Sequence, residues 1–159
     1  MNIYSPEPGT HIPALVKAVM ESTGPILELG MGLFSTTLLH ALAEDQNREL
    51  YSFEHKGKIL NTFKRFESEK HHLIFVPHWD DIDIDREWGV ALVDHEPSNR
   101  RAKEIKRLAN NTKYVVAHDS EKENEHIYHY SEIYDLFLYK KFYTKSDPNT
   151  VVMSNVCLI

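Results

Sequence analysis

The sequence contains a single cysteine, Cys157, among 159 residues. One cysteine excludes an internal disulfide and a cysteine-rich zinc site, and it fits a reducing compartment. Long apolar runs are also missing, since no stretch approaches the ~18–20 residues that span a bilayer. The first residues lack the basic start and apolar stretch of a secretory leader. We therefore expect a cytoplasmic protein with no membrane partner.

Basic residues are scarce as well: 18 Lys and Arg stand against 24 Asp and Glu, for a formal charge of −6. Such a surface repels phosphate backbones, so we expect a small-molecule partner and no nucleic acid. The length predicts one domain over residues 1–159, with an N-terminal arm and helix over residues 1–22. Assembly into a homo-oligomer is left open.

Two kinds of apolar segment alternate along the chain. Short apolar runs predict strands at residues 26–29, 50–54, 72–76, 89–94 and 113–118. Helical spacing predicts helices at residues 11–20, 35–43, 56–69, 98–110 and 123–138. Near the end, a turn cluster at residues 146–149 separates two further strands, 141–145 and 150–156, which predicts a hairpin. The pattern predicts a three-layer α/β fold with a mostly parallel seven-stranded sheet and a C-terminal antiparallel hairpin.

Open α/β sheets bind ligands beyond the carboxyl ends of their strands, so the residues that follow each strand are the informative ones. Gly30 and Gly32 follow the first strand, where glycines allow a sharp turn and a close ligand approach. Ser35 then opens a helix whose free N–H groups attract anionic or polar ligands. A tight turn that binds nothing is the alternative.

Acidic and aromatic residues follow the next two strands. Glu54 lies 24 residues after Gly30, a spacing typical of an acid that accepts hydrogen bonds from a ribose diol. His55 beside it has the shape to pack on a purine. Trp79, with Asp80 and Asp81, offers a stacking wall and an acceptor for an exocyclic amine, although a polar loop with one buried tryptophan fits equally well.

Acids and imidazoles gather after the fourth and fifth strands. Asp94, His95 and Glu96 follow one strand, and His118 ends the other. We expect His95, Glu96 and His118 to be candidate catalytic bases, because the pKa of such groups can be tuned to near 7. Asp94 is also a candidate for binding an amino group.

These pieces, in this order, resemble the class I S-adenosylmethionine-dependent methyltransferases over nearly the full chain. The resemblance implies a Rossmann-like methyltransferase fold with S-adenosylmethionine as the cofactor. It implies that the glycine loop holds the methionine part, Glu54 the ribose, and the acid after residues 72–76 the adenine amine. The candidate cofactor-binding residues are Glu28, Gly30, Gly32, Ser35, Glu54, His55, Trp79, Asp80, Asp81 and Asp94.

A narrower resemblance is to the catechol O-methyltransferase-like group, in which acids after these two strands bind magnesium. Asp94 with His95 matches its first motif, Asp119 with Ser120 matches half of the second, and Pro97 stands where that group has a lysine. With this oxygen ligand set incomplete, we expect no metal ion.

Two other functions also remain compatible with the sequence. A nicotinamide-dependent oxidoreductase shares the glycine turn and the later acid, and a non-catalytic cofactor-binding or assembly protein can share the whole fold. We expect the basic run from Arg100 to Arg107 to be a solvated helix face. We expect His71, His72, His126 and His129 to lie at the surface.

Overall fold

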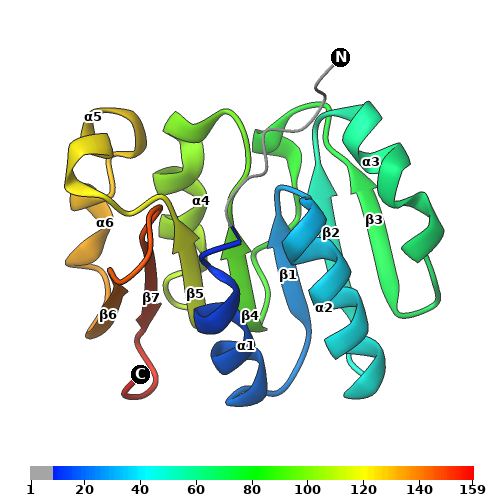
Figure 1. The fold of residues 1–159 in the computed structure, drawn as a ribbon, viewed down its shortest axis with the longest axis horizontal. Helices are drawn as coiled ribbons and strands as arrows, with labels where there is room; N and C mark the ends of the chain where they lie inside the picture. The colour runs from blue at the N-terminus through cyan, green and yellow to red at the C-terminus, as the bar shows by residue number, and fades with distance from the viewer. Residues whose placement is uncertain (1–8) are drawn as a thin grey trace.

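The computed structural model describes residues 9–159, so most of the arm expected over residues 1–10 lies outside the described residues. Strands and helices alternate along it (Figure 1). The strands are β1 (Ile26–Leu29), β2 (Leu50–Glu54), β3 (His71–Phe75), β4 (Trp88–Val93), β5 (Thr112–His118), β6 (Tyr139–Tyr143) and β7 (Thr150–Ser154). The helices are α1 (Ile12–Met20), α2 (Leu33–Asp45), α3 (Gly57–Phe63), α4 (Arg101–Leu108), α5 (Glu125–Tyr128) and α6 (Ser131–Tyr134), and single 3₁₀ turns are η1 (Lys64–Phe66), η2 (Trp79–Asp81), η3 (Ser98–Arg100) and η4 (Lys122–Asn124).

The seven strands form one sheet in the order β3-β2-β1-β4-β5-β7-β6. The strands from β3 to β5 run parallel, whereas β7 is antiparallel to both β5 and β6. The predicted fold class is therefore confirmed, although the first hairpin strand begins two residues earlier than expected. Because the parallel strands point the same way, the residues that follow β1, β2, β4 and β5 meet at one edge of the sheet.

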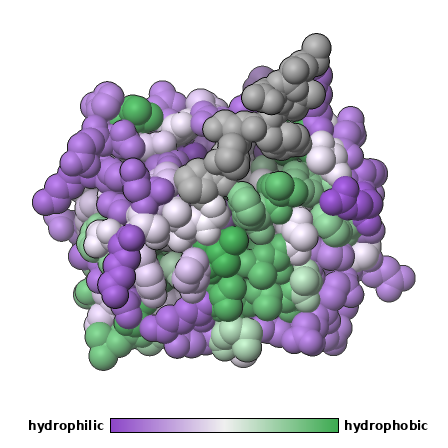
Figure 2. Space-filling view, in the orientation of Figure 1, coloured by the Kyte–Doolittle hydropathy of each residue, from purple (hydrophilic) through white to green (hydrophobic). Residues whose placement is uncertain are grey.

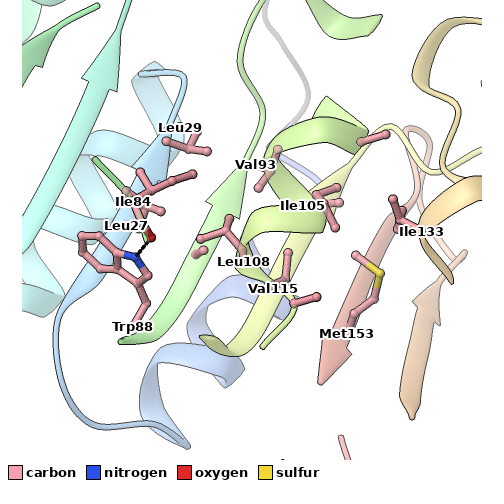
Figure 3. Packing of buried hydrophobic residues seen from close by; sticks show 14 of the residues in the cluster. Leu27, Leu29, Ile84, Trp88, Val93, Ile105, Leu108, Val115, Ile133 and Met153 are labelled. Atoms are coloured by element: carbon pink, nitrogen blue, oxygen red, sulfur yellow. Dashed lines mark hydrogen bonds between the residues drawn. The ribbon is translucent and has the colours of Figure 1, made fainter. Parts of the chain in front are cut away.

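Helices cover both faces of the sheet: α1, α2 and α3 lie on one face, and α4, α5 and α6 lie on the other (Figure 1). All six residues of β4 are buried, as expected for a central parallel strand covered on both faces. On the α4 side, Leu27 and Val93 pack with Ile105, and the indole of Trp88 donates a hydrogen bond to the Ile84 carbonyl at 2.9 Å (Figure 3).

Two predicted helices are shorter than their periodicity suggested. The helix expected at residues 56–69 ends by Phe66, because Ser68 Oγ accepts the backbone N–H groups of Lys70 and His71 and so starts β3. The helix expected at residues 123–138 breaks at His129, which has a left-handed φ of 54°. The carboxylate of Glu125 accepts the N–H of Ser131, which starts α6.

Figure 2 shows hydrophobic residues gathered over α1 and α2, with hydrophilic residues around them. Met20 at the end of α1 and Leu33 and Phe34 at the start of α2 are exposed members of these helices. In residues 9–159, no helix combines the length and the apolar character that crossing a bilayer requires.

Candidate functional site

A cavity opens at the carboxyl ends of β1, β2, β4 and β5, where the strand order changes direction between β1 and β4. An open α/β sheet binds its ligands at such a point. The cavity volume is about 180 Å³, below the ~300–1,000 Å³ common for ligand pockets, so a nucleoside-sized ligand would extend onto the open rim. The lining residues are Gly30, Met31, Gly32, Glu54, His55, Lys56, Ile59, Asp94, His95, Glu96, Arg101, His118, Asp119 and Pro148.

The glycine turn after β1 forms one wall of the cavity. Gly30 has a φ of +91°, and a Cβ on it would lie 2.6 Å from both the Asp94 carbonyl oxygen and the His95 Cα. Only glycine therefore allows the end of β1 to lie this close to the end of β4. At Gly32, the one atom of the described residues that a Cβ would meet within 4 Å is Ser35 Oγ, at 3.3 Å, so this position leaves space beside the cavity.

Glu54 joins the glycine turn to the end of β2. Its Oε2 accepts the backbone N–H of Met31 at 3.1 Å, and its Oε1 accepts the N–H of Lys56 at 2.7 Å. His55 Nδ1 lies 3.2 Å from the same Oε1. The Glu54 side chain is 5% exposed and lines the cavity. The hydrogen bonds from Met31 and Lys56 hold its carboxylate from two sides.

Glu28 lies beneath the glycine turn rather than in the cavity. Its carboxylate is fully buried and accepts hydrogen bonds from Ser52 Oγ at 2.5 Å and Thr36 Oγ1 at 2.9 Å. Thr36 Oγ1 in turn accepts the N–H of Gly32 at 3.0 Å. Burial raises the pKa of Glu28 to about 7. The structure therefore places Glu28 as a support of the loop, and Ser35, also buried, is not among the lining residues.

The expectation that His71 lies at the surface is wrong. His71 is 1% exposed, because its side chain points under α2. Its Nε2 lies 2.9 Å from Ser52 Oγ, and its Nδ1 lies 3.1 Å from His40 Nδ1. Burial lowers its pKa to about 4. Its histidine neighbour, His72, is only half-buried and pairs with Glu49 at 2.6 Å.

The three residues expected around an adenine are not brought together in the cavity. The Trp79 ring packs against His95 with 4.1 Å between ring centroids, and its indole donates to the Glu96 carbonyl. The exposed carboxylate of Asp80 accepts hydrogen bonds from Arg100 and Lys103, which hold its pKa well below the usual range. Asp81 lines a separate depression with Tyr51, Phe53 and Ile74.

An ion-pair cluster forms the opposite wall. Arg101 is 3% exposed, so the prediction that it lies on a solvated helix face is wrong. Its Nη2 lies 3.0 Å from Asp94 Oδ1, and its Nη1 lies 2.8 Å from Asp119 Oδ2. Burial opposes ionisation of Asp94, but the hydrogen bond from His118 and the charge of Arg101 outweigh it and hold its pKa below the usual range. The cluster therefore keeps charged side chains buried just after β4 and β5 and at the start of α4.

His118 connects this cluster to the start of the described chain. Its Nε2 lies 3.0 Å from Thr10 Oγ1, and its Nδ1 lies 3.4 Å from Asp94 Oδ2. Burial lowers the His118 pKa, but the Asp94 and Asp119 carboxylates outweigh that effect and raise it. The ring of His11 meets the His118 ring edge-on, with 4.7 Å between centroids.

His95 and Glu96 occupy very different environments. His95 Nε2 lies 3.1 Å from Glu104 Oε2, and both side chains are 0% exposed. Its Nδ1 is buried without a hydrogen-bond partner in the part of the chain that the structure describes, and burial lowers its pKa. Glu96 is exposed at the rim, where its carboxylate accepts the N–H and hydroxyl of Ser98.

Several residues in or next to the cavity were not identified from the sequence. Arg101 is one of two adjacent arginines at a helix start, and helical periodicity alone does not say which of the two turns inward. His11 lies 83 residues before Asp94, and no local pattern connects them. Met31, Lys56, Ile59 and Pro148 also line the cavity.

Neither a protein-family model nor a curated protein matches the sequence. Solved structures of methyltransferases do match. A candidate O-methyltransferase from Klebsiella pneumoniae has a TM-score of 0.66 at 12% identity, over 98% of this chain and 83% of that chain. An rRNA methylase from Streptococcus thermophilus has a TM-score of 0.61 at 14% identity, over 89% of this chain and 93% of that chain.

A candidate O-methyltransferase from Nostoc punctiforme matches with a TM-score of 0.60 at 10% identity, over 92% of this chain. This chain spans only 57% of its length. At such identities the likeness shows the fold alone. Because the similar structures include O-methyltransferases and an rRNA methylase, the likeness determines neither the acceptor atom nor the class of acceptor.

Proposed function

We propose that this protein, which has the Rossmann-like fold of the class I S-adenosylmethionine-dependent methyltransferases, transfers a methyl group to an oxygen or nitrogen atom of a small molecule. One observation supports this most. The glycine turn and the Glu54 carboxylate line one end of the cavity, while acids and imidazoles line the other. The sulfonium of S-adenosylmethionine supplies an electrophilic methyl group, so the protein has only to align the acceptor and remove a proton.

The residues at the glycine end fit the cofactor. Gly32 leaves space for the methionine part and is the N-cap of α2, and the N-terminus of a helix favours polar or anionic ligand groups. Glu54 accepts one backbone hydrogen bond on each oxygen, and a carboxylate has about four lone-pair sites. Glu54 therefore keeps acceptor capacity for two ribose hydroxyls. His55 and Ile59 lie on the same side and would face the adenine.

The proton acceptor in this proposal is His95. Its Nε2–H donates to Glu104, which leaves the lone pair on Nδ1, an atom without another partner. Glu104 acts as a positioning residue that holds the ring in this tautomer, the arrangement common in bases oriented by a carboxylate. His118 Nε2 already contacts Thr10, and Glu96 is exposed at the rim, so these two candidates are less suited.

Calorimetric titration with S-adenosylhomocysteine tests the cofactor assignment. We expect the wild type to bind and Gly32→Val not to bind, because the added side chain fills the methionine space. Leu33→Val is the matched control, since Leu33 is 55% exposed and does not line the cavity. Binding of NADH instead of S-adenosylhomocysteine by the folded wild type would favour an oxidoreductase and contradict the proposal.

The acceptor class needs its own test. The protein is incubated with S-adenosylmethionine labelled at the methyl group and with a cell extract separated into small-molecule, RNA and protein fractions. We expect label in the small-molecule fraction. Label in RNA alone would contradict a small-molecule acceptor while keeping methyl transfer, and no label in any fraction would favour a non-catalytic cofactor-binding protein.

A further inference from the structure

His11 is a buried imidazole that makes no hydrogen bond within residues 9–159. The residue is 5% exposed, and neither ring nitrogen has a partner among these residues. A polar group buried in this way costs free energy unless it binds something. An imidazole nitrogen that makes no hydrogen bond can offer its lone pair to a ligand. Its ring lies against His118, which belongs to the cavity wall.

The hydrogen bonds of Thr10 determine which nitrogen of His118 carries a proton. Thr10 Oγ1 donates to the Pro148 carbonyl at 2.7 Å, and a carbonyl can only accept. Thr10 Oγ1 must therefore accept the Nε2–H of His118 at 3.0 Å. The other nitrogen, Nδ1, then faces Asp94 Oδ2 at 3.4 Å. Either a proton or a metal ion must lie between these two electron-rich atoms.

We propose that His11, Asp94 and His118 together bind a divalent transition-metal ion. Each offers one ligand atom, and these atoms all lie within 4.8 Å of one another. Metal bonds of ~2.0–2.2 Å bring ligand atoms to ~3.4 Å apart, so binding requires a shift of about an ångström shared among three side chains. Two imidazoles and one carboxylate suit zinc or a similar ion better than magnesium, which prefers oxygen ligands.

The surroundings support this ligand set over the one that the catechol O-methyltransferase-like resemblance suggested. Asp119 Oδ2 is engaged by Arg101 at 2.8 Å and by the Tyr128 hydroxyl at 3.0 Å. Arg101 also holds Asp94 Oδ1 and so turns Oδ2 toward His118. Thr10 orients the His118 ring, as outer partners of ligating histidines commonly do. Three protein ligands leave one position open, beside the cavity.

Calorimetric titration of the chelator-treated full chain with zinc chloride tests this proposal. No cofactor is present, so the outcome does not depend on methyl transfer. We expect one ion per chain and, for His11→Gln, an affinity at least about 100-fold weaker. Thr10→Val should weaken binding by about 10–100-fold, the usual effect of removing an outer partner. His126→Gln, at an exposed histidine outside the ligand set, is the matched control and should bind as the wild type does.

Thermal unfolding of each variant without metal confirms that it folds, and His11→Gln removes no hydrogen bond. Magnesium chloride at the same concentrations should neither bind nor compete. Equal zinc affinity of the wild type and His11→Gln, equally tight magnesium binding, or no zinc binding by the folded wild type would each overturn the proposal. In the last case the Asp94 and His118 pair is an ion pair only.

Discussion

Arg101 and Asp94 form a largely buried ion pair, with 3.0 Å between Nη2 and Oδ1 and side-chain exposures of 4% and 16%. The pair joins the first residue of α4 to the residue that follows β4. It fixes the wall of the cavity opposite Glu54. An ion pair at the surface would contribute little, but breaking a buried one leaves an uncompensated charge.

Replacing Arg101 should therefore destabilise the fold strongly. Arg101→Met leaves Asp94 and Asp119 without their common partner, and we expect a loss of about 3–5 kcal/mol in the free energy of unfolding. Lys103→Met is the control on the same helix, since the pair of Lys103 with Asp80 is exposed and its loss should cost less than about 1 kcal/mol. Urea denaturation measures both, and equal losses would contradict a structural role for the buried pair.

Two glycines with similar φ angles should differ in their tolerance of alanine. Gly24 has a φ of +85° and a Cβ there would meet only one atom, at 3.8 Å, so Gly24→Ala should cost ~1–2 kcal/mol of backbone strain. Gly30→Ala adds a collision with the backbone of Asp94 and His95. We expect a further loss of at least ~1–3 kcal/mol. A Gly30→Ala variant as stable as Gly24→Ala would show that the two strand ends can move apart.

Glu54 should contribute directly to cofactor affinity. Removing a charged acceptor costs roughly 1.5–3 kcal/mol, so Glu54→Gln should bind S-adenosylhomocysteine about 10–150-fold more weakly. Asp81→Asn is the informative control, because Asp81 was expected to contact the adenine but lies in a separate depression. We expect its affinity to equal that of the wild type. A loss of affinity in Asp81→Asn without one in Glu54→Gln would contradict the assignment of Glu54 and favour Asp81 as the cofactor-binding residue.

Glu28 should make stability depend on pH. Its pKa is about 7 in the folded protein, raised by burial from an ordinary value of 4.5. The protonated form of Glu28 therefore contributes to the free energy of unfolding in full below pH 4.5. This contribution decreases above pH 4.5 and is lost as the pH rises through 7. Relative to Glu28→Gln, the wild type should lose up to roughly 3 kcal/mol between pH 4.5 and pH 8.

Urea denaturation across this pH range measures that difference. His71 and Glu54 lie near Glu28 and are unchanged in the variant, so their titration largely cancels in the comparison. Glu69→Gln, at an exposed position, should follow the wild type at every pH. A constant difference between wild type and Glu28→Gln would show that Glu28 does not titrate in this range.

His95 should affect the rate of methyl transfer rather than acceptor binding. If its Nδ1 takes the proton, His95→Gln should lower kcat by ~10²–10⁴ at saturating cofactor, with little change in KM. Glu96→Gln provides the comparison, because Glu96 lies exposed at the rim. A full kcat in His95→Gln with a large loss in Glu96→Gln would transfer the role to Glu96.

The edge of the sheet that carries the site was predictable from the sequence. Apolar runs followed by Gly30, Glu54, Asp94 and His118 indicate parallel strands, and the carboxyl ends of parallel strands meet at one edge. All four residues line the same cavity in the structure. The same reasoning also identified His55, His95 and Glu96, because each lies within three residues of the end of a strand.

Side-chain direction was not predictable in this way. Glu28 and Gly30 belong to one motif, yet Glu28 lies within β1 and points into the core beneath α2, whereas Gly30 lies beyond the end of the strand and lines the cavity. Trp79 packs behind His95, and Asp80 turns outward to Arg100 and Lys103. The direction of a loop side chain depends on its tertiary contacts, and the local sequence does not reveal those contacts.

By itself, the sequence determined the alternation of strands and helices, because hydrophobic periodicity is local and each element carries its own pattern. It likewise determined which loops meet, since parallel pairing brings their starting points together. Only the tertiary structure decided that Arg101 is buried between two acids and that His11 reaches His118 from the start of α1. These contacts join segments that are distant in the chain, and their energy comes from burial and charge pairing that exist only once the whole sheet has formed.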